Sequence, residues 1–104
     1  MYTPDNWVIL KISVEDTIYK LLSGVSGGYL DGDSWRVNSG ITSVKEDGDY
    51  LLFSGTSGSV YKCHKDSETL RMNNFYIYES FKKQFGNSIK IIDYVDFKKE
   101  FKEE

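Results

Sequence analysis

The stretch from Trp35 to His64 places the strongest constraint on what this chain can fold into. It contains three runs, residues 35–41, 50–53 and 59–64, that are rich in β-branched and aromatic residues. Segments 46–49 and 55–58, which contain glycine, separate these runs, and Val44 precedes the first segment. Short glycine-containing segments between β-rich runs are typical of hairpins. The pattern therefore predicts an antiparallel meander of three short strands.

More strands are expected upstream of this meander. Apolar residues alternate through residues 6–14, which predicts a strand, and residues 17–22 return after a turn at 15–16. Part of that return, residues 19–22, also fits a helical turn. Gly40 interrupts the regular alternation and predicts a bulge that bends its strand.

A helix that packs over the sheet is expected downstream. Residues 75–85 carry an apolar stripe at helical spacing, with Asn73 or Asn74 as the expected cap and Gly86 at the end. Residues 88–93 predict a last strand, and residues 95–104 predict a short terminal helix that either docks or frays. The expected fold is α+β, with a bent antiparallel sheet of five or six strands (SH3-like or a small barrel) covered by the 75–85 helix, in a single domain spanning residues 1–104.

Composition narrows the function classes. The net charge of −3 disfavours a nucleic-acid binder, because phosphate recognition leaves a basic surface. A single cysteine allows no internal disulfide framework, and no cofactor is expected. The start of the chain does not resemble a signal peptide, and no apolar run is long enough to span a membrane. We therefore expect a soluble, cytoplasmic protein. The high aromatic content, 15%, fits either a small core or a binding surface.

The motifs that resemble known sites fit turns better. The segment that begins at Asp31 lacks the ligand spacing of a calcium loop, and residues 55–59 lack the lysine and following helix of a phosphate loop. Neighbours on a strand point to opposite faces, so Cys63 and His64 are not expected to form a nucleophile pair. A small hydrolase that uses Ser59 and His64 is the weakest of the functional hypotheses, and we expect no catalytic or metal-binding residues.

Two candidate binding surfaces follow from the remaining residues. The glycine-rich segment 23–34 predicts either a wide connection between strands or a binding loop. In the second case Tyr29, Leu30, Asp31, Asp33 and Trp35 are the residues expected to contact a protein partner.

The alternative surface is basic. Arg36, Lys62 and His64 would form a small patch if they shared a face, which fits an anionic, nucleotide-like ligand. The same residues fit an ordinary salt-bridged face equally well. Under either hypothesis a homodimer formed by pairing of exposed strand edges is also expected to be feasible.

Segments 19–41 and 57–65, with the runs YLDGDSWR and SGI in the first of them, resemble small hypothetical proteins encoded by phages and their hosts. The resemblance covers about half of the chain and implies an origin rather than a chemistry. The absence of alanine, which is typical of AT-rich coding sequences, agrees with such a source. The leading hypothesis is a non-enzymatic phage accessory protein that binds and inhibits a host protein, such as an anti-defence (anti-CRISPR-like) factor.

Overall fold

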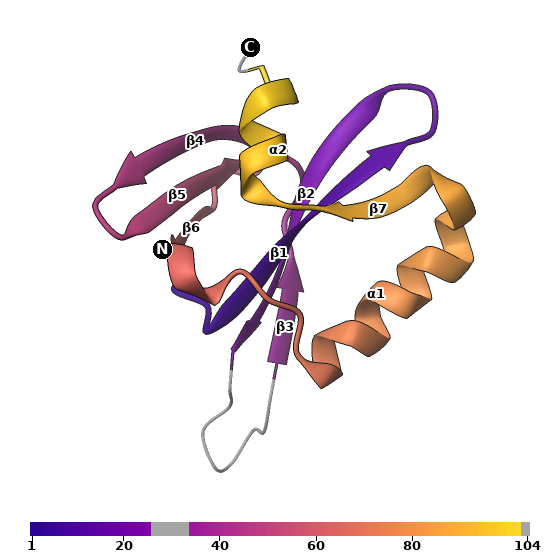
Figure 1. The fold of residues 1–104 in the computed structure, drawn as a ribbon, viewed down its shortest axis with the longest axis horizontal. Helices are drawn as coiled ribbons and strands as arrows, with labels where there is room; N and C mark the ends of the chain where they lie inside the picture. Colours follow the sequence, from indigo (N-terminus) through magenta and orange to yellow (C-terminus); the bar gives the residue numbers. More distant parts are fainter. Residues whose placement is uncertain (26–33, 103–104) are drawn as a thin grey trace.

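Strand β1 (Asn6–Ser13) lies at the centre of a four-stranded antiparallel sheet with the order β3-β2-β1-β7. The computed structural model describes residues 1–25 and 34–102 (Figure 1). Strand β2 (Thr17–Val25) pairs with β1 along its whole length, from Asn6 opposite Gly24 to Ser13 opposite Thr17. Strands β3 (Ser34–Val37) and β7 (Ile89–Ile92) form the two edges. The predicted N-terminal hairpin and the predicted last strand are both confirmed.

A second antiparallel sheet contains β4 (Ile41–Asp47), β5 (Tyr50–Gly55) and β6 (Val60–His64), in that order. Gly48 and Gly58 have φ angles of 60° and 89° in the turns that connect these strands, where residues with a side chain are strained. The short 3₁₀ turn η1 (Lys65–Ser67) follows β6. This sheet is a three-stranded meander with turns at the two predicted places.

The prediction of a single sheet with five or six strands is wrong. Residues 35–41 do not form one strand, because the chain leaves the first sheet after Val37 and enters the second sheet at Ile41. At the corner, the Asn38 side chain takes the place of a backbone partner, since its Oδ1 accepts the Leu21 N–H at 2.8 Å. Gly40 turns the chain with a φ of 142°, and the predicted irregularity lies one step later, between Ile41 and Ser43. The α+β class and the antiparallel pairing are confirmed.

Two cores lie on the two faces of β1. One face packs between the sheets, where Trp7, Phe53 and Phe97 are fully buried. The other face, which includes Val8 and Leu10, packs beneath helix α1 (Met72–Phe85). Much of the aromatic content therefore belongs to the core, as one of the two interpretations of the composition expected.

Helix α1 begins earlier than predicted. Its N-cap is Arg71 rather than Asn73 or Asn74, and Asn74 lies buried in the first turn, where its Oδ1 accepts a hydrogen bond of 2.8 Å from Asn6 Nδ2. The predicted stripe is confirmed, because Ile77, Phe81 and Phe85 all pack against the second core, together with Tyr78. As predicted, the helix ends at Gly86, whose φ is 60°, and the 3₁₀ turn η2 (Gly86–Ser88) leads into β7.

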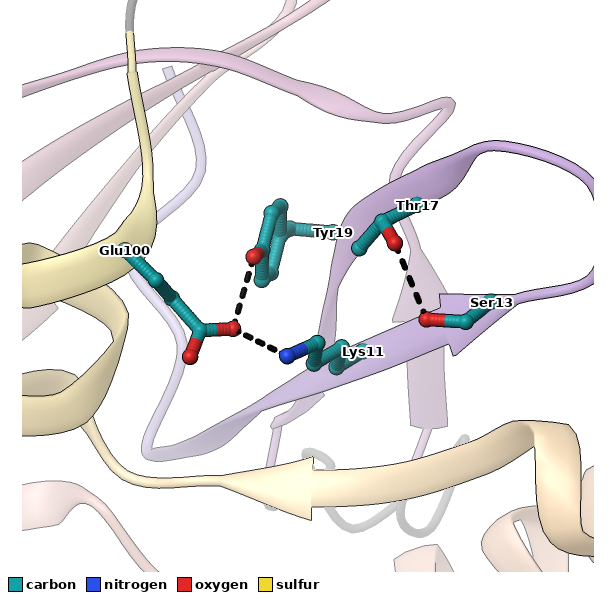
Figure 2. Close-up of polar contacts among 5 residues, drawn as sticks. All are labelled: Lys11, Ser13, Thr17, Tyr19 and Glu100. Atoms are coloured by element: carbon teal, nitrogen blue, oxygen red, sulfur yellow. Dashed lines mark hydrogen bonds and ion pairs between the residues drawn. The ribbon is translucent and has the colours of Figure 1, made fainter.

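The terminal helix α2 (Tyr94–Glu100) is shorter than predicted and docks on the protein. Asp93 caps it through a side-chain bond to the Asp96 N–H, and the buried Phe97 inserts into the core between the sheets. At its end, Glu100 Oε1 accepts a hydrogen bond of 2.7 Å from the Tyr19 hydroxyl and lies 2.6 Å from Lys11 Nζ (Figure 2). This network ties the last turn of α2 to β1 and β2.

Gly24 is a position where an added methyl group should destabilise the fold. A Cβ there would lie 2.6 Å from Asn6 Oδ1 and still closer to Asn74 Oδ1. Elsewhere in a strand Gly→Ala removes unfolded-state entropy and is often stabilising. We expect Gly24→Ala instead to lower the free energy of unfolding by about 1–3 kcal/mol, measured by urea denaturation. The loss should shrink in an Asn74→Ala background, and an equal loss in both backgrounds would contradict the close contact.

The Glu100 network predicts a specific pH dependence of stability. The hydrogen bond from Lys11, and then the one from Tyr19, hold the pKa of Glu100 below its usual value. This stabilisation is therefore present above about pH 4.3, the ordinary glutamate pKa, and is lost as the pH falls through the folded-state pKa. Because the Glu100 side chain is 36% exposed, the contribution should be about 1 kcal/mol or less.

Glu100→Gln tests this network. The variant should be less stable than wild type at pH 7, and the difference should disappear as the pH approaches about 3 in thermal unfolding. Glu15→Gln, which changes an exposed glutamate in the β1–β2 turn, is the control for the loss of one charge. If the stability of Glu100→Gln depends on pH as that of wild type does, the Glu100 network does not contribute to stability.

Candidate functional site

Trp35 is the one residue of the predicted partner-binding set that the structure describes. Tyr29, Leu30, Asp31 and Asp33 lie outside the described residues. Trp35 is on the edge strand β3, and its side chain is 48% exposed, which is unusual for the largest apolar side chain. The geometry of β3 therefore determines whether Trp35 and its strand are accessible to a partner.

The backbone of β3 is paired on one side only among the described residues. Ser23 lies opposite Arg36, and the Asn38 N–H donates to the Leu21 carbonyl at 3.1 Å. Because hydrogen-bonded pairs alternate along an antiparallel ladder, the N–H and C=O groups of Trp35 and Val37 point away from β2. Strand β3 thus has an open edge with four backbone groups directed outward.

Two further exposed aromatic side chains, those of Phe75 and Tyr76, lie near the start of α1. Trp35 is paired with Gly24, so its side chain is on the same sheet face as the Asn74 amide that covers Gly24. Phe75 and Tyr76 follow Asn74 in the helix and are 46% and 65% exposed, with ring centroids 6.3 Å apart. Figure 1 shows the start of α1 at the same end of the molecule as β3. We call Trp35, Phe75 and Tyr76 the aromatic end.

Sequence reasoning missed Phe75 and Tyr76 because they were included in the predicted helix without a role of their own. A signal was present, since neither residue belongs to the stripe formed by Ile77, Phe81 and Phe85. Aromatic residues off the apolar stripe of a surface helix remain exposed unless another element covers them.

The predicted basic patch is only partly assembled. Lys62 and His64 share a face of β6, where both contact the Tyr50 ring: Lys62 Nζ lies 4.5 Å from its centroid, and the His64 ring centroid lies 5.0 Å from it. Arg36 lies elsewhere, with its guanidinium 4.1 Å from the centre of the Tyr2 ring.

The partner of Tyr2 explains this separation. Tyr2 stacks on Tyr61, and Tyr61 points to the face of β6 opposite Lys62. Burial raises the pKa of Tyr61 although the nearby Arg36 opposes the shift. Arg36 and Lys62 therefore contact aromatic rings on two different faces. The structure does not bring Arg36, Lys62 and His64 together as one anion site.

Ser59 and His64 are also far apart. Ser59 immediately precedes β6 and His64 is its last residue, so the two are about 16 Å apart at the usual rise of a strand. His64 Nδ1 accepts the Asp66 N–H at 3.0 Å, and the His64 carbonyl accepts the Trp7 indole N–H at 2.8 Å. The structure therefore gives His64 a local structural role and does not form the Ser59–His64 pair.

Two further properties concern the described part of the chain. Neither described helix has the length and apolar character that a membrane-spanning helix requires. Within residues 1–25 and 34–102, no three His, Cys, Asp or Glu side chains gather closely enough to hold a metal ion.

Comparisons with models of protein families, with curated proteins and with solved structures gave no match to this chain. Among the described residues, the open edge of β3 and the aromatic end leave backbone polar groups and large aromatic side chains exposed.

Cys63 should be unreactive in the folded protein. It is fully buried, and burial raises the pKa of its thiol to about 12. Only the thiolate reacts, so modification must wait for local or global opening. At pH 8 we expect a disulfide reagent to label Cys63 at least about 100-fold more slowly than in the urea-unfolded chain.

Thr69→Cys supplies the control, because Thr69 is exposed in the loop before α1. In native buffer, the new cysteine of that variant should react rapidly with one equivalent of the disulfide reagent. Rapid labelling of the wild-type protein would mean that the β6 core opens easily.

Proposed function

We propose that this protein is a non-enzymatic binding domain that captures an extended segment of a protein partner at the open edge of β3. The observation that carries the proposal is the combination of backbone groups at Trp35 and Val37 that have no partner within residues 1–25 and 34–102 with the exposed ring of Trp35 on the same strand. Edge strands with free N–H and C=O groups are templates for an added strand.

The backbone supplies affinity in this mode, and the side chains supply selectivity. An added strand would place alternate residues on the two sheet faces. On the face of Trp35 and the aromatic end, the matching residues are apolar or aromatic. On the other face, next to Arg36, the matching residue is acidic, because the Arg36 guanidinium contacts a ring and makes no ion pair among the described residues. The partner segment is thus an apolar strand that carries one acidic residue.

Trp35 is the expected anchor of this interface. Tryptophan is enriched among the residues that dominate interface energies, and truncating such an anchor costs about 2 kcal/mol or more. Phe75 and Tyr76, at the same end of the molecule, add further exposed aromatic surface. That the partner is a host protein, and that binding inhibits it, is the prediction made from the sequence, and it stays a prediction.

The test uses two edges of the same sheet. Tagged wild-type protein, Trp35→Ala and Ile91→Ala are used to capture binders from a low-GC bacterial lysate. Ile91 is 39% exposed on β7, at the opposite edge, and is the matched control. We expect a stoichiometric partner that Ile91→Ala retains and that Trp35→Ala binds at least about 30-fold more weakly. Circular dichroism checks that both variants are folded.

The backbone contribution is tested separately by Val37→Pro, which removes an outward N–H while Pro remains compatible with an edge strand. Weaker capture by this variant supports strand addition. Equal capture by wild type, Trp35→Ala and Val37→Pro would overturn the proposal. So would a Trp35-dependent homodimer in sedimentation analysis, because the edge would then be occupied by a second copy of the chain.

A further inference from the structure

Strand β7 gives the four-stranded sheet a second edge, opposite β3. The Leu21 N–H and C=O groups both bond to Asn38, on the side of β2 that faces β3. Leu21 is also paired with Ile9 of β1, and because its backbone groups point away from β1, those of Ile9 point away from β2. They point toward Ile92, the partner of Ile9 in β7. The backbone groups of Ile92 are therefore directed inward, to β1.

The outward backbone groups of β7 belong to Ile89 and Ile91, because successive residues of a strand point to alternate sides. One of these groups is already occupied. The ammonium of Lys82, in the last turn of α1, donates to the Ile89 carbonyl at 3.2 Å. This contact agrees with the direction assigned to Ile89 from the pairing. A lysine at an edge strand is a common means of preventing further strand pairing.

The β3 edge of a second copy matches the β7 edge in direction and length. The two strands run in opposite directions, and each has four residues. Pairing Trp35 with Ile91 and Val37 with Ile89 would use the outward groups of both strands and continue the antiparallel sheet. Because one edge meets a different edge, the contact is heterologous and would build open chains of molecules rather than a closed dimer.

The apolar faces of the two edges match as well. Ile91 is paired with Leu10, which packs beneath α1, and Trp35 lies on the same sheet face as the Asn74 amide of that helix. The exposed side chains of Trp35 and Ile91 would therefore be cross-strand neighbours in the joined sheet. These features favour self-association unless other residues oppose it.

On the opposite face, the same register brings two cations together. It places Arg36 of one copy directly opposite Lys90 of the next, since each lies between the two outward-directed residues of its strand. Like charges directly opposite one another in a ladder are destabilising. An acidic residue at the position of Lys90 would instead pair with Arg36, as inferred above for the partner segment.

The charge of Lys90 has no ion-pair partner within residues 1–25 and 34–102. Glu100 is close enough for Lys90 to lower its pKa, but the Glu100 carboxylate bonds to Lys11 at 2.6 Å. Asp93 and Asp96, the other acids beside this edge, make their contacts within α2. Lys90 is exposed and would therefore meet Arg36 as a cation.

We propose that Lys82 and Lys90 protect the β7 edge, so that β3 accepts a strand of another protein but not β7 of a second copy. Lys82 occupies a backbone acceptor that an added strand needs, and Lys90 places a positive charge where Arg36 favours a negative one. Specificity of this kind depends on repulsion of the wrong partner as well as on attraction of the right one. The inference rests on the proposed function, because it requires that β3 accepts an added strand.

The test removes both lysines. Lys82→Met deletes the ammonium and keeps a long side chain that suits a helix, and Lys90→Thr deletes the charge with a residue that suits a strand. The matched control is Lys83→Met with Lys45→Thr, which makes the same changes at exposed positions on α1 and on the edge strand β4. Urea denaturation checks that both double variants are folded.

Sedimentation velocity of the full chain between about 10 and 300 μM measures assembly. Wild type and the control should remain monomeric. The variant with Lys82→Met and Lys90→Thr should form species larger than a dimer, whose size grows with concentration. Adding Val37→Pro, which removes an outward N–H of β3, should raise the concentration needed for assembly by at least about tenfold.

Three results would overturn the proposal: a double variant that stays monomeric, assembly of wild type at the same concentrations, or assembly that Val37→Pro does not weaken. Failure here is distinguishable from failure of the proposed function. If the double variant stays monomeric while Val37→Pro weakens partner capture, only the role of the two lysines is wrong. If the double variant assembles through β3 while no partner is captured, the role of the lysines stands and the proposed function is wrong.

Discussion

The rest of the structure depends on the burial of β1 on both of its faces. A strand at the centre of an antiparallel sheet usually exposes one face to water, but here Trp7 and Ile9 pack against the second sheet, whereas Val8 and Leu10 pack beneath α1. Each side of the strand thus belongs to a different core. The second sheet and α1 are held on opposite sides of the same eight residues, and neither can be removed without exposing half of β1 to water.

Three hydrogen bonds at the start of β1 also hold neighbouring elements against this strand. Asn6 lies at the start of β1, and its amide donates to Asn74 Oδ1 and to the Thr69 carbonyl. The Trp7 indole, one residue further on, donates to the His64 carbonyl on the other side of the sheet. Buried polar groups need hydrogen-bond partners, and these three bonds also position the neighbouring elements. They fix where α1 and β6 meet β1, so each layer is positioned by a directional bond as well as by apolar contact.

Local elements were predictable from this sequence because local patterns determine them. The alternation in β1, the turns at Gly48 and Gly58, and the Ile77–Phe81–Phe85 stripe all act within a few residues. The division into two sheets was not predictable in the same way. It depends on Asn38, whose side chain ends one ladder by bonding to Leu21, 17 residues away. Likewise, Phe75 and Tyr76 are exposed because no other described element packs over them. The sequence pattern of the helix alone does not contain this information.

The candidate site lies at one end of β2, and the contacts that hold α2 lie toward the other end. Gly24 is paired with Trp35, and Tyr19, about 16 Å away at the usual rise of a strand, contacts Phe97 and Glu100 of α2. Between them Leu21 and Leu22 are buried in the two different cores, which holds the strand rigidly in the middle. Coupling between distant sites needs an element with two alternative arrangements, and a strand paired on both sides and buried on both faces has one. Binding at the β3 edge should therefore leave the contacts between β2 and α2 unchanged.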